Sequence, residues 1–241
     1  KKDECHRPER IDAGFKEVDY GLTTLELAKM IKEAGIDLPA CDKSDFDDPF
    51  GTATGSGVIF GATGGVMEAA LRTVIELVCG IKVEDIFEHA DIIPVRGMEG
   101  VKYAEIKIPK VGPVPPILAG LIKDWKWLDG VTVKVAVAHG TANAKKVMEN
   151  IKAGGQLAGC HFIEFMGCPG GCIGGGGQPI PTNPEIREAR ARAIYAEDSA
   201  YPIRKSHENP AVLELYTNFF TEGPCGHKSH KLLHTHYTKR G

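Results

Sequence analysis

Apolar residues recur along this chain at two spacings, one typical of helices and one typical of strands. A helix is predicted to begin at the capping box of Thr23 and Glu26 and to keep helical spacing as far as Gly35. The same spacing predicts helices over residues 66–78, about 142–151, 183–197 and 209–220. Apolar stretches predict strands over residues 101–108, 132–140 and 161–165, and a short buried segment over residues 58–60.

The order of these elements sets the expected fold class. Strand, glycine turn, helix and strand follow one another, which favours an α/β fold with a mostly parallel sheet and flanking helices. After Pro181 the sequence changes to charged, alanine-rich helices that have little core of their own. We therefore predict a body formed by residues 1–181 and a C-terminal helical extension, residues 182–241, that packs on it.

The composition of the chain indicates which binding partners and which cellular location to expect. The net charge of −3 offers no basic field for nucleic acid, and no apolar run is long enough to form a membrane span. Seven cysteines, an odd number, favour reduced thiols and metal ligation over a disulfide framework. These features predict a cytoplasmic protein, with a periplasmic one as the alternative. The charged opening KKDECHRPER contains no apolar segment of a signal peptide, and we expect it to begin partway through a longer polypeptide.

One candidate for chemistry is the glycine turn GATGG, residues 61–65, which precedes a predicted helix. Free N–H groups at a helix N-terminus attract anions, so the turn could cradle a phosphate. The turn matches neither of the common nucleotide-binding glycine patterns. Two other interpretations are close packing of helix on strand, and backbone amides laid against some other anionic ligand.

The segment FMGCPGGCIGGGGQP, residues 165–179, is a more specific candidate. Thiolates select zinc or iron–sulfur clusters, and glycines allow backbone to approach a bulky inorganic ligand. A structural zinc site would need a second ligand pair nearby, and a redox CxxC has two intervening residues rather than three. The remaining alternative is two buried cysteines in a glycine-rich turn.

Histidines offer weaker candidates. His139 ends an apolar run and is interpreted as a strand-end histidine with a satisfied ring rather than a catalytic base. A second group lies in the tail and could hold a metal, although an exposed or packed terminus is the commoner explanation. Its members are Cys225, His227, His230, His234 and His236.

These segments resemble the catalytic domain of the iron-iron (FeFe) hydrogenases. FMGCPGGCIGGGGQP looks like the third signature of that family, and GVIFGATGGVMEAALRT is similar to its glycine-helix segment. The tail, LYTNFF with SHKLLHTHY, resembles the small-subunit region of these enzymes, and the opening KKDE looks like the end of the second signature.

The resemblance implies reversible reduction of protons to H₂, with ferredoxin or a similar electron carrier as partner. The implied cofactor is an H-cluster, a 4Fe–4S cubane bridged by cysteine to a two-iron subcluster with CO, cyanide and a bridging dithiolate. Carried over by position, Cys168 would be a cubane ligand and Cys172 the bridging ligand. Lys1 would donate to a cyanide as the catalytic-site lysine. Phe60 and Met166 would pack beside the two-iron unit. Gly61 and its neighbours would offer backbone donors to its CO and cyanide ligands, which is the third interpretation of the glycine turn.

The chain departs from the family pattern in its number of ligands. The resemblance requires four cysteine ligands, and the recognised motif supplies two. Cys5 lies on the wrong side of the Lys-Lys pair to substitute. We therefore expect a fragment, one half of a split enzyme, or a relative without hydrogen chemistry, inactive alone and dependent on a chain or upstream segment with the missing ligands. The competing hypothesis is a non-catalytic iron–sulfur sensor or cluster-assembly relative.

Overall fold

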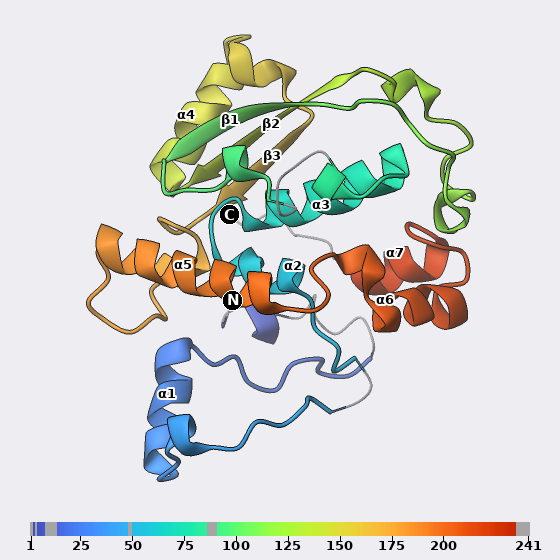
Figure 1. Ribbon diagram of the computed structural model, residues 1–241. Helices are drawn as coiled ribbons and strands as arrows, with labels where there is room; N and C mark the ends of the chain where they lie inside the picture. The colour runs from blue at the N-terminus through green and yellow to red at the C-terminus, as the bar shows by residue number, and fades with distance from the viewer. Residues whose placement is uncertain (1, 3, 8–13, 48–49, 86–90, 235–241) are drawn as a thin grey trace.

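The computed structural model describes residues 2, 4–7, 14–47, 50–85 and 91–234 (Figure 1). Its centre is a three-stranded sheet of β1 (Val101–Lys107), β2 (Thr132–His139) and β3 (Phe162–Met166), in that order. The three strands lie where the apolar stretches predict them, and the α/β class is confirmed.

The sheet is mixed, so the expectation of a mostly parallel sheet is wrong in this detail. β2 and β3 are parallel, because helix α4 (Thr141–Lys152) forms the crossover between them. β1 and β2 are antiparallel, with Val101 opposite Ala138 and Lys107 opposite Thr132. The chain between them has only short 3-10 turns among the described residues, so it returns without a crossover helix.

Helices cover both faces of this sheet, as Figure 1 shows. Helix α3 (Gly65–Cys79) lies on one face, where its buried side chains pack with Ile106 and Val135. On the other face Val147 of α4 packs with Ala136. Alternate residues of β2 thus serve two different cores, as the two-residue period of a strand requires.

Local signals place the helix ends. Thr23 caps α1 (Thr24–Glu33) in a complete capping box with Glu26, as predicted. Gly80 ends α3 at a φ of 66°, in the left-handed region that glycine adopts readily. Asn183 caps α5 (Pro184–Ala200) by accepting the Ile186 N–H at 2.8 Å.

The segment over residues 58–60, predicted to be short and buried, is helical and is buried only in part. α2 (Gly55–Val58) runs directly into a 3-10 turn, Ile59–Gly61. Ile59 is fully buried, but Phe60 is 46% exposed. The backbone N–H groups of Gly55 and Ser56 donate to the carbonyls of Ile203 and Arg204, and this pairing with a distant segment is invisible in local sequence.

The C-terminal helices follow the cysteine motif in sequence, and the first of them packs on earlier elements of the chain. α5 packs against α2 and the Ile59–Gly61 turn, where Ala62, Ile173 and Ala191 form a small core. α6 (Pro210–Glu214) continues into a π-helical turn, Leu215–Phe219, and α7 (His227–Leu233) follows. Among the described residues no helix is long and apolar enough to cross a membrane.

Candidate functional site

The two motif cysteines lie on a turn that leaves the end of β3. Both thiols are exposed, and neither forms a disulfide. Gly170 and Gly171 between them have φ values of 83° and 91°, which an L side chain rarely adopts. A Cβ on Gly171 would lie 2.8 Å from the Gly61 carbonyl oxygen. The double glycine is therefore required by the shape of this turn and by its closeness to the Ile59–Gly61 turn.

The same turn brings together most of the residues that the resemblance selects. Cys172 begins a short 3-10 turn, Cys172–Gly174, that contacts the Ile59–Gly61 turn carrying Phe60 and Gly61. Met166, half-buried, ends β3 two residues before Cys168, and its carbonyl accepts the Gly140 N–H at 2.8 Å. Lys1 lies outside the described residues.

The glycine ribbon after the cysteines holds helix α1. The Leu25 N–H donates to the Gly177 carbonyl at 3.0 Å. Gln178 Nε2 donates both to Thr24 Oγ1 at 3.3 Å and to the Cys172 carbonyl at 3.2 Å. None of the ten residues of α1 is buried, so these polar contacts are its main link to the ribbon.

The glycine turn before α3 binds an anion that belongs to the chain itself. The carboxylate of buried Glu164, on β3, accepts the N–H groups of Gly64 and Met67, each at 2.7 Å. A helix N-terminus attracts negative charge, and here the carboxylate already supplies it. Of the three interpretations of GATGG, the structure favours close packing of helix on strand and leaves these amides engaged rather than free for phosphate.

Lys102 lies beneath the same turn and is also buried. Its ammonium donates to the carbonyls of Val95 and Gly97. Burial lowers the pKa of Lys102 to about 8, although the nearby Glu164 carboxylate acts in the opposite direction.

The other cysteines do not complete a compact ligand set around the turn. Cys79 is buried in the main core and Cys160 beside the second core, and burial raises the pKa of both thiols. Cys5 and Cys41 donate to the local carbonyls of Lys2 and Asp37. Cys225 is exposed in the C-terminal region.

The histidine-rich tail does not assemble a metal cage in the part of the chain that the structure describes. His230 and His234 stack with ring centroids 4.5 Å apart, but they join no group of three clustered ligands. His236 lies outside the described residues.

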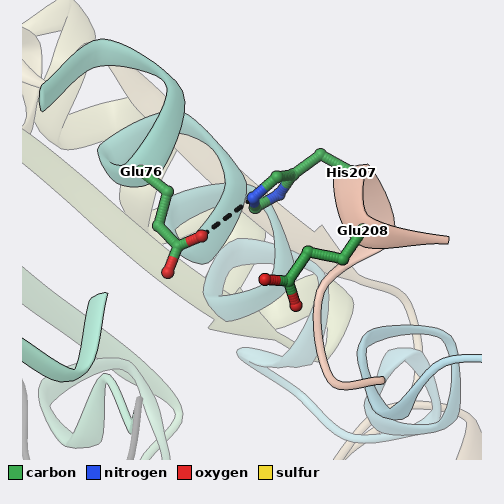
Figure 2. A group of neighbouring side chains, drawn as sticks. All are labelled: Glu76, His207 and Glu208. Atoms are coloured by element: carbon green, nitrogen blue, oxygen red, sulfur yellow. Dashed lines mark hydrogen bonds and ion pairs between the residues drawn. The ribbon is translucent and has the colours of Figure 1, made fainter. Parts of the chain in front are cut away.

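One compact group of possible metal ligands does occur among the described residues: Glu76, His207 and Glu208 (Figure 2). Their ligand atoms are already used. Glu76 accepts from Lys205 Nζ at 2.7 Å through one oxygen and lies 2.9 Å from His207 Nε2 through the other. Burial alone would raise the pKa of Glu76, but the Lys205 hydrogen bond holds it below its usual value. Glu208 pairs with Lys82 at 2.6 Å. The Glu76 carboxylate therefore serves as the partner of Lys205 and His207, and these contacts tie α3 to the C-terminal region.

A second buried network was not found from the sequence. Arg72 and Asp198, both fully buried, form two hydrogen bonds of 2.8 Å. Glu68 accepts from Arg72 at 2.6 Å and from Arg96 at 2.7 Å. Asp91 and Arg204 complete the set, which joins α3, α5 and two loops. Three arginines face three carboxylates, so the network is neutral overall. Only the Glu68–Arg72 spacing of four residues could have signalled it.

Comparison with known proteins identifies the family. Residues 1–176 match the family model described as the C-terminal domain of the iron-only hydrogenase large subunit. The chain belongs to this hydrogenase family. Residues 184–240 match a second hydrogenase model, described as the iron hydrogenase small subunit. The resemblance of the cysteine motif and of the tail is thus confirmed.

Curated hydrogenases match along the whole chain. The NADP-reducing hydrogenase subunit HndD of Solidesulfovibrio fructosivorans is 44% identical over 241 residues, which is 100% of this chain and 36% of that protein. Iron hydrogenase 1 of Clostridium pasteurianum is 38% identical over 99% of this chain and 38% of its own length. The chain therefore spans less than half the length of these relatives.

Solved structures of the family share the fold. The FeFe-hydrogenase HydA1 of Chlamydomonas reinhardtii has a TM-score of 0.70 and 39% identity over 98% of this chain and 60% of that chain. More distant relatives have other printed roles: a cytosolic Fe-S cluster assembly factor of Xenopus tropicalis is 26% identical over 98% of this chain.

The residues present fit one side of an iron–sulfur cluster. Both thiols are exposed. Cys168 Sγ also lies 3.7 Å from the position that a Cβ would take on Gly175, so it lies beside backbone that carries no side chain there. Thiolates beside bare backbone are the donor set that such clusters use. The four thiolates of a cubane exceed what this turn offers, so the fit is to half of the ligand set.

Proposed function

We propose that this chain forms one wall of the H-cluster site of an FeFe hydrogenase that reversibly reduces protons to H₂. The observation that carries the proposal is the anchored turn, on which Cys168 and Cys172 are exposed against the Ile59–Gly61 turn. When bound, the H-cluster would supply the redox chemistry, and the protein would supply position, electrostatics and exclusion of water.

Each residue of the wall has a proposed task. Cys168 would ligate the cubane, and Cys172 would bridge it to the two-iron subcluster. Phe60, 46% exposed, and half-buried Met166 would cover the two-iron unit with apolar surface. Gly61 would allow backbone to approach that unit, and Lys1 would donate to a cyanide ligand, a charge-assisted contact that is strong in a dry site.

The whole site requires further ligands. We propose that a second polypeptide segment brings the remaining cysteines and that ferredoxin or a similar carrier supplies electrons. The division into a body, residues 1–181, and a helical extension, residues 182–241, remains part of this proposal. A cytoplasmic location is also part of the proposal. A periplasmic location is the alternative, because one hydrogenase relative is named as periplasmic.

Reconstitution tests the proposal. The 241-residue chain is treated with iron and sulfide in two samples. One contains the chain alone, and the other also contains a polypeptide with the part of a related hydrogenase that this chain does not match and that would supply the remaining cysteine ligands. We expect no H₂ evolution and less than one cubane per chain alone, but a 4Fe–4S EPR signal with the second polypeptide. For H₂ production the mixture also receives the two-iron subcluster.

Cysteine variants make the test specific. Cys168→Ala and Cys172→Ala should each abolish cluster retention, whereas Cys41→Ala, at an exposed thiol on the N-terminal arm, should leave it unchanged. Equal retention in all three variants would refute the ligand assignment.

The second candidate function is that of a non-catalytic cluster-assembly relative, which the assembly factors at 26% identity favour. It predicts that the reconstituted mixture binds iron and sulfide, and transfers the cluster to an apo-protein, without producing H₂ once the two-iron subcluster is supplied. H₂ production under those conditions would exclude it.

A further inference from the structure

His139 ends β2 directly behind the cysteine turn, and its ring is almost fully buried at 8% exposure. It pairs with Met166 in the parallel register of β2 and β3. The chain therefore places an imidazole between the end of the sheet and the residues that separate Cys168 from Cys172.

Both ring nitrogens have partners, and the partners define the protonation form. Nδ1 accepts the Gly170 N–H at 2.6 Å. Nε2 lies 3.2 Å from the Met98 carbonyl and 3.1 Å from the Glu99 carbonyl. Carbonyl oxygens only accept, so Nε2 must carry the proton, and Nδ1 must have a free lone pair. The arrangement requires the neutral Nε2–H tautomer.

Gly170 anchors the cysteine turn, because both its N–H and its carbonyl form hydrogen bonds to other segments of the chain. Its N–H donates to His139, and its carbonyl accepts the Thr63 N–H at 3.0 Å. Pro169 has no N–H to offer, and the Gly171 N–H closes the turn onto the Cys168 carbonyl at 3.0 Å. Of these anchors, the one to His139 is made by a side chain.

We propose that His139 is a positioning residue for the metal-binding turn. In its Nε2–H form it ties the loop of Met98 and Glu99 to the Gly170 amide, and this fixes the separation of the Cys168 and Cys172 thiols. The proposal rests on the proposed function for the identity of the ligand. The hydrogen bonds that define it are independent of that ligand.

Two amide variants separate the two nitrogens of the ring. His139→Asn places an acceptor oxygen near the position of Nδ1, whereas His139→Gln reaches the position of Nε2 and leaves Gly170 without an acceptor. His139→Phe keeps the ring and removes both hydrogen bonds. Trp125→Phe is the matched control, because it removes another buried side-chain bond to backbone, from Nε1 to the Gly112 carbonyl at 2.7 Å.

Amide hydrogen exchange of the full 241-residue chain, followed by NMR, is the first measurement. We expect protection of the Gly170 amide to fall about tenfold or more in His139→Gln and His139→Phe, and to be largely kept in His139→Asn. Trp125→Phe should leave Gly170 protection unchanged relative to the other amides. Equal protection in all four variants, or loss in His139→Asn alone, would overturn the proposal.

Titration with Cd²⁺ measures the effect on the thiols. Cadmium bound to thiolates absorbs in the ultraviolet, and other cysteines of the chain can contribute to this absorbance. The double variant Cys168→Ala/Cys172→Ala measures their contribution, and the difference from the unsubstituted chain is the signal of the Cys168–Cys172 pair. We expect His139→Phe to weaken Cd²⁺ binding at this pair about 5- to 10-fold and His139→Asn to restore most of it. An unchanged affinity in His139→Phe would refute the positioning role.

The tautomer is tested in the unsubstituted chain, which covers the case that a variant does not fold. Nitrogen-15 spectra of the histidines should show His139 with an unprotonated Nδ1 and a protonated Nε2, and the opposite assignment would overturn the proposal. None of these measurements requires an assembled H-cluster. A chain that passes them but fails the reconstitution would retain His139 as a positioning residue and lose the hydrogenase proposal.

Discussion

Removing one negative charge from the buried arginine–carboxylate network should destabilise the protein strongly. The substitution is Asp198→Asn, which keeps the size of the side chain and removes its charge. Asp198 is fully buried and accepts hydrogen bonds from Arg72 at 2.8 Å and from Arg204 at 2.7 Å. The variant would leave three arginines facing two carboxylates.

The magnitude follows from burial. Water cannot replace the lost charge at Arg72, whose side chain has 0% exposure. Breaking a buried ion pair by removing one partner costs about 3–5 kcal/mol, whereas an exposed pair is worth about 0–1 kcal/mol. A domain of ordinary stability has about 5–15 kcal/mol to lose. The variant should therefore fold at low temperature, with a large part of its stability gone.

Urea unfolding followed by circular dichroism measures the effect. With a slope of about 2 kcal/mol per molar urea, the midpoint should fall by about 1.5–2.5 M. Glu188→Gln is the matched control, since it makes the same chemical change on the same helix, at a pair with Arg192 that is 3.9 Å long and exposed. Its midpoint should move by less than about 0.5 M.

Salt separates the two environments. Added NaCl should leave the Asp198→Asn difference nearly intact, because a buried pair is poorly screened, and should erase any effect of Glu188→Gln. Burial raises the pKa of Asp198, but the Arg72 and Arg204 hydrogen bonds outweigh it and hold the pKa below its usual value. A midpoint shift no larger than that of the control would refute the reasoning that this network stabilises the fold.

Three further substitutions test the surroundings of the cysteine turn. Glu164→Gln should lower the free energy of unfolding by about 1–3 kcal/mol in urea, because one helix amide loses its acceptor. Gly171→Ala should cost about 1–3 kcal/mol in the same assay, since its φ is 91° and Gly61 O lies 2.8 Å from the new Cβ, whereas Gly176→Ala meets nothing within 4 Å and should be nearly neutral. Burial lowers the pKa of Lys102 from 10.5 to about 8, so the unfolded chain binds more protons between these values. The contribution of Lys102 to the free energy of unfolding should therefore rise from pH 8 to 10.5, so the free energy of unfolding of the unsubstituted chain minus that of Lys102→Met should increase with pH over this range.

Sequence predicts the elements whose signals are local. The Thr23 capping box begins α1 as predicted, and the helices expected over residues 66–78 and 183–197 end at Gly80 and begin after the Asn183 cap, signals that act within a few residues. The cysteine turn is similar, because its glycines are needed for the local φ values. A conformation that only a few residue types adopt readily can be predicted from the residue types at that position.

Sequence fails where the partner is distant. Asp198 and Arg72 are 126 positions apart, and Gly55 binds a carbonyl of a segment near residue 203. His139 was interpreted as a satisfied strand-end histidine, and its ring is indeed satisfied. What could not be predicted is that Gly170, 31 positions away, satisfies it. Pairings of this kind arise only when the sheet and the turn have assembled.

The attachment of α1 to the glycine ribbon has a practical consequence for coupling the protein to an electrode or a bead. Lys29 and Lys32 are exposed on α1, and a tether there pulls on a helix whose first turn is bonded to Gly177 and, through Gln178, to the Cys172 carbonyl. Lys145 and Lys146 on α4 are equally exposed, and α4 lies on the face of the sheet opposite α3. A tether on α4 leaves the ribbon free of load, so α4 is the better side for immobilisation.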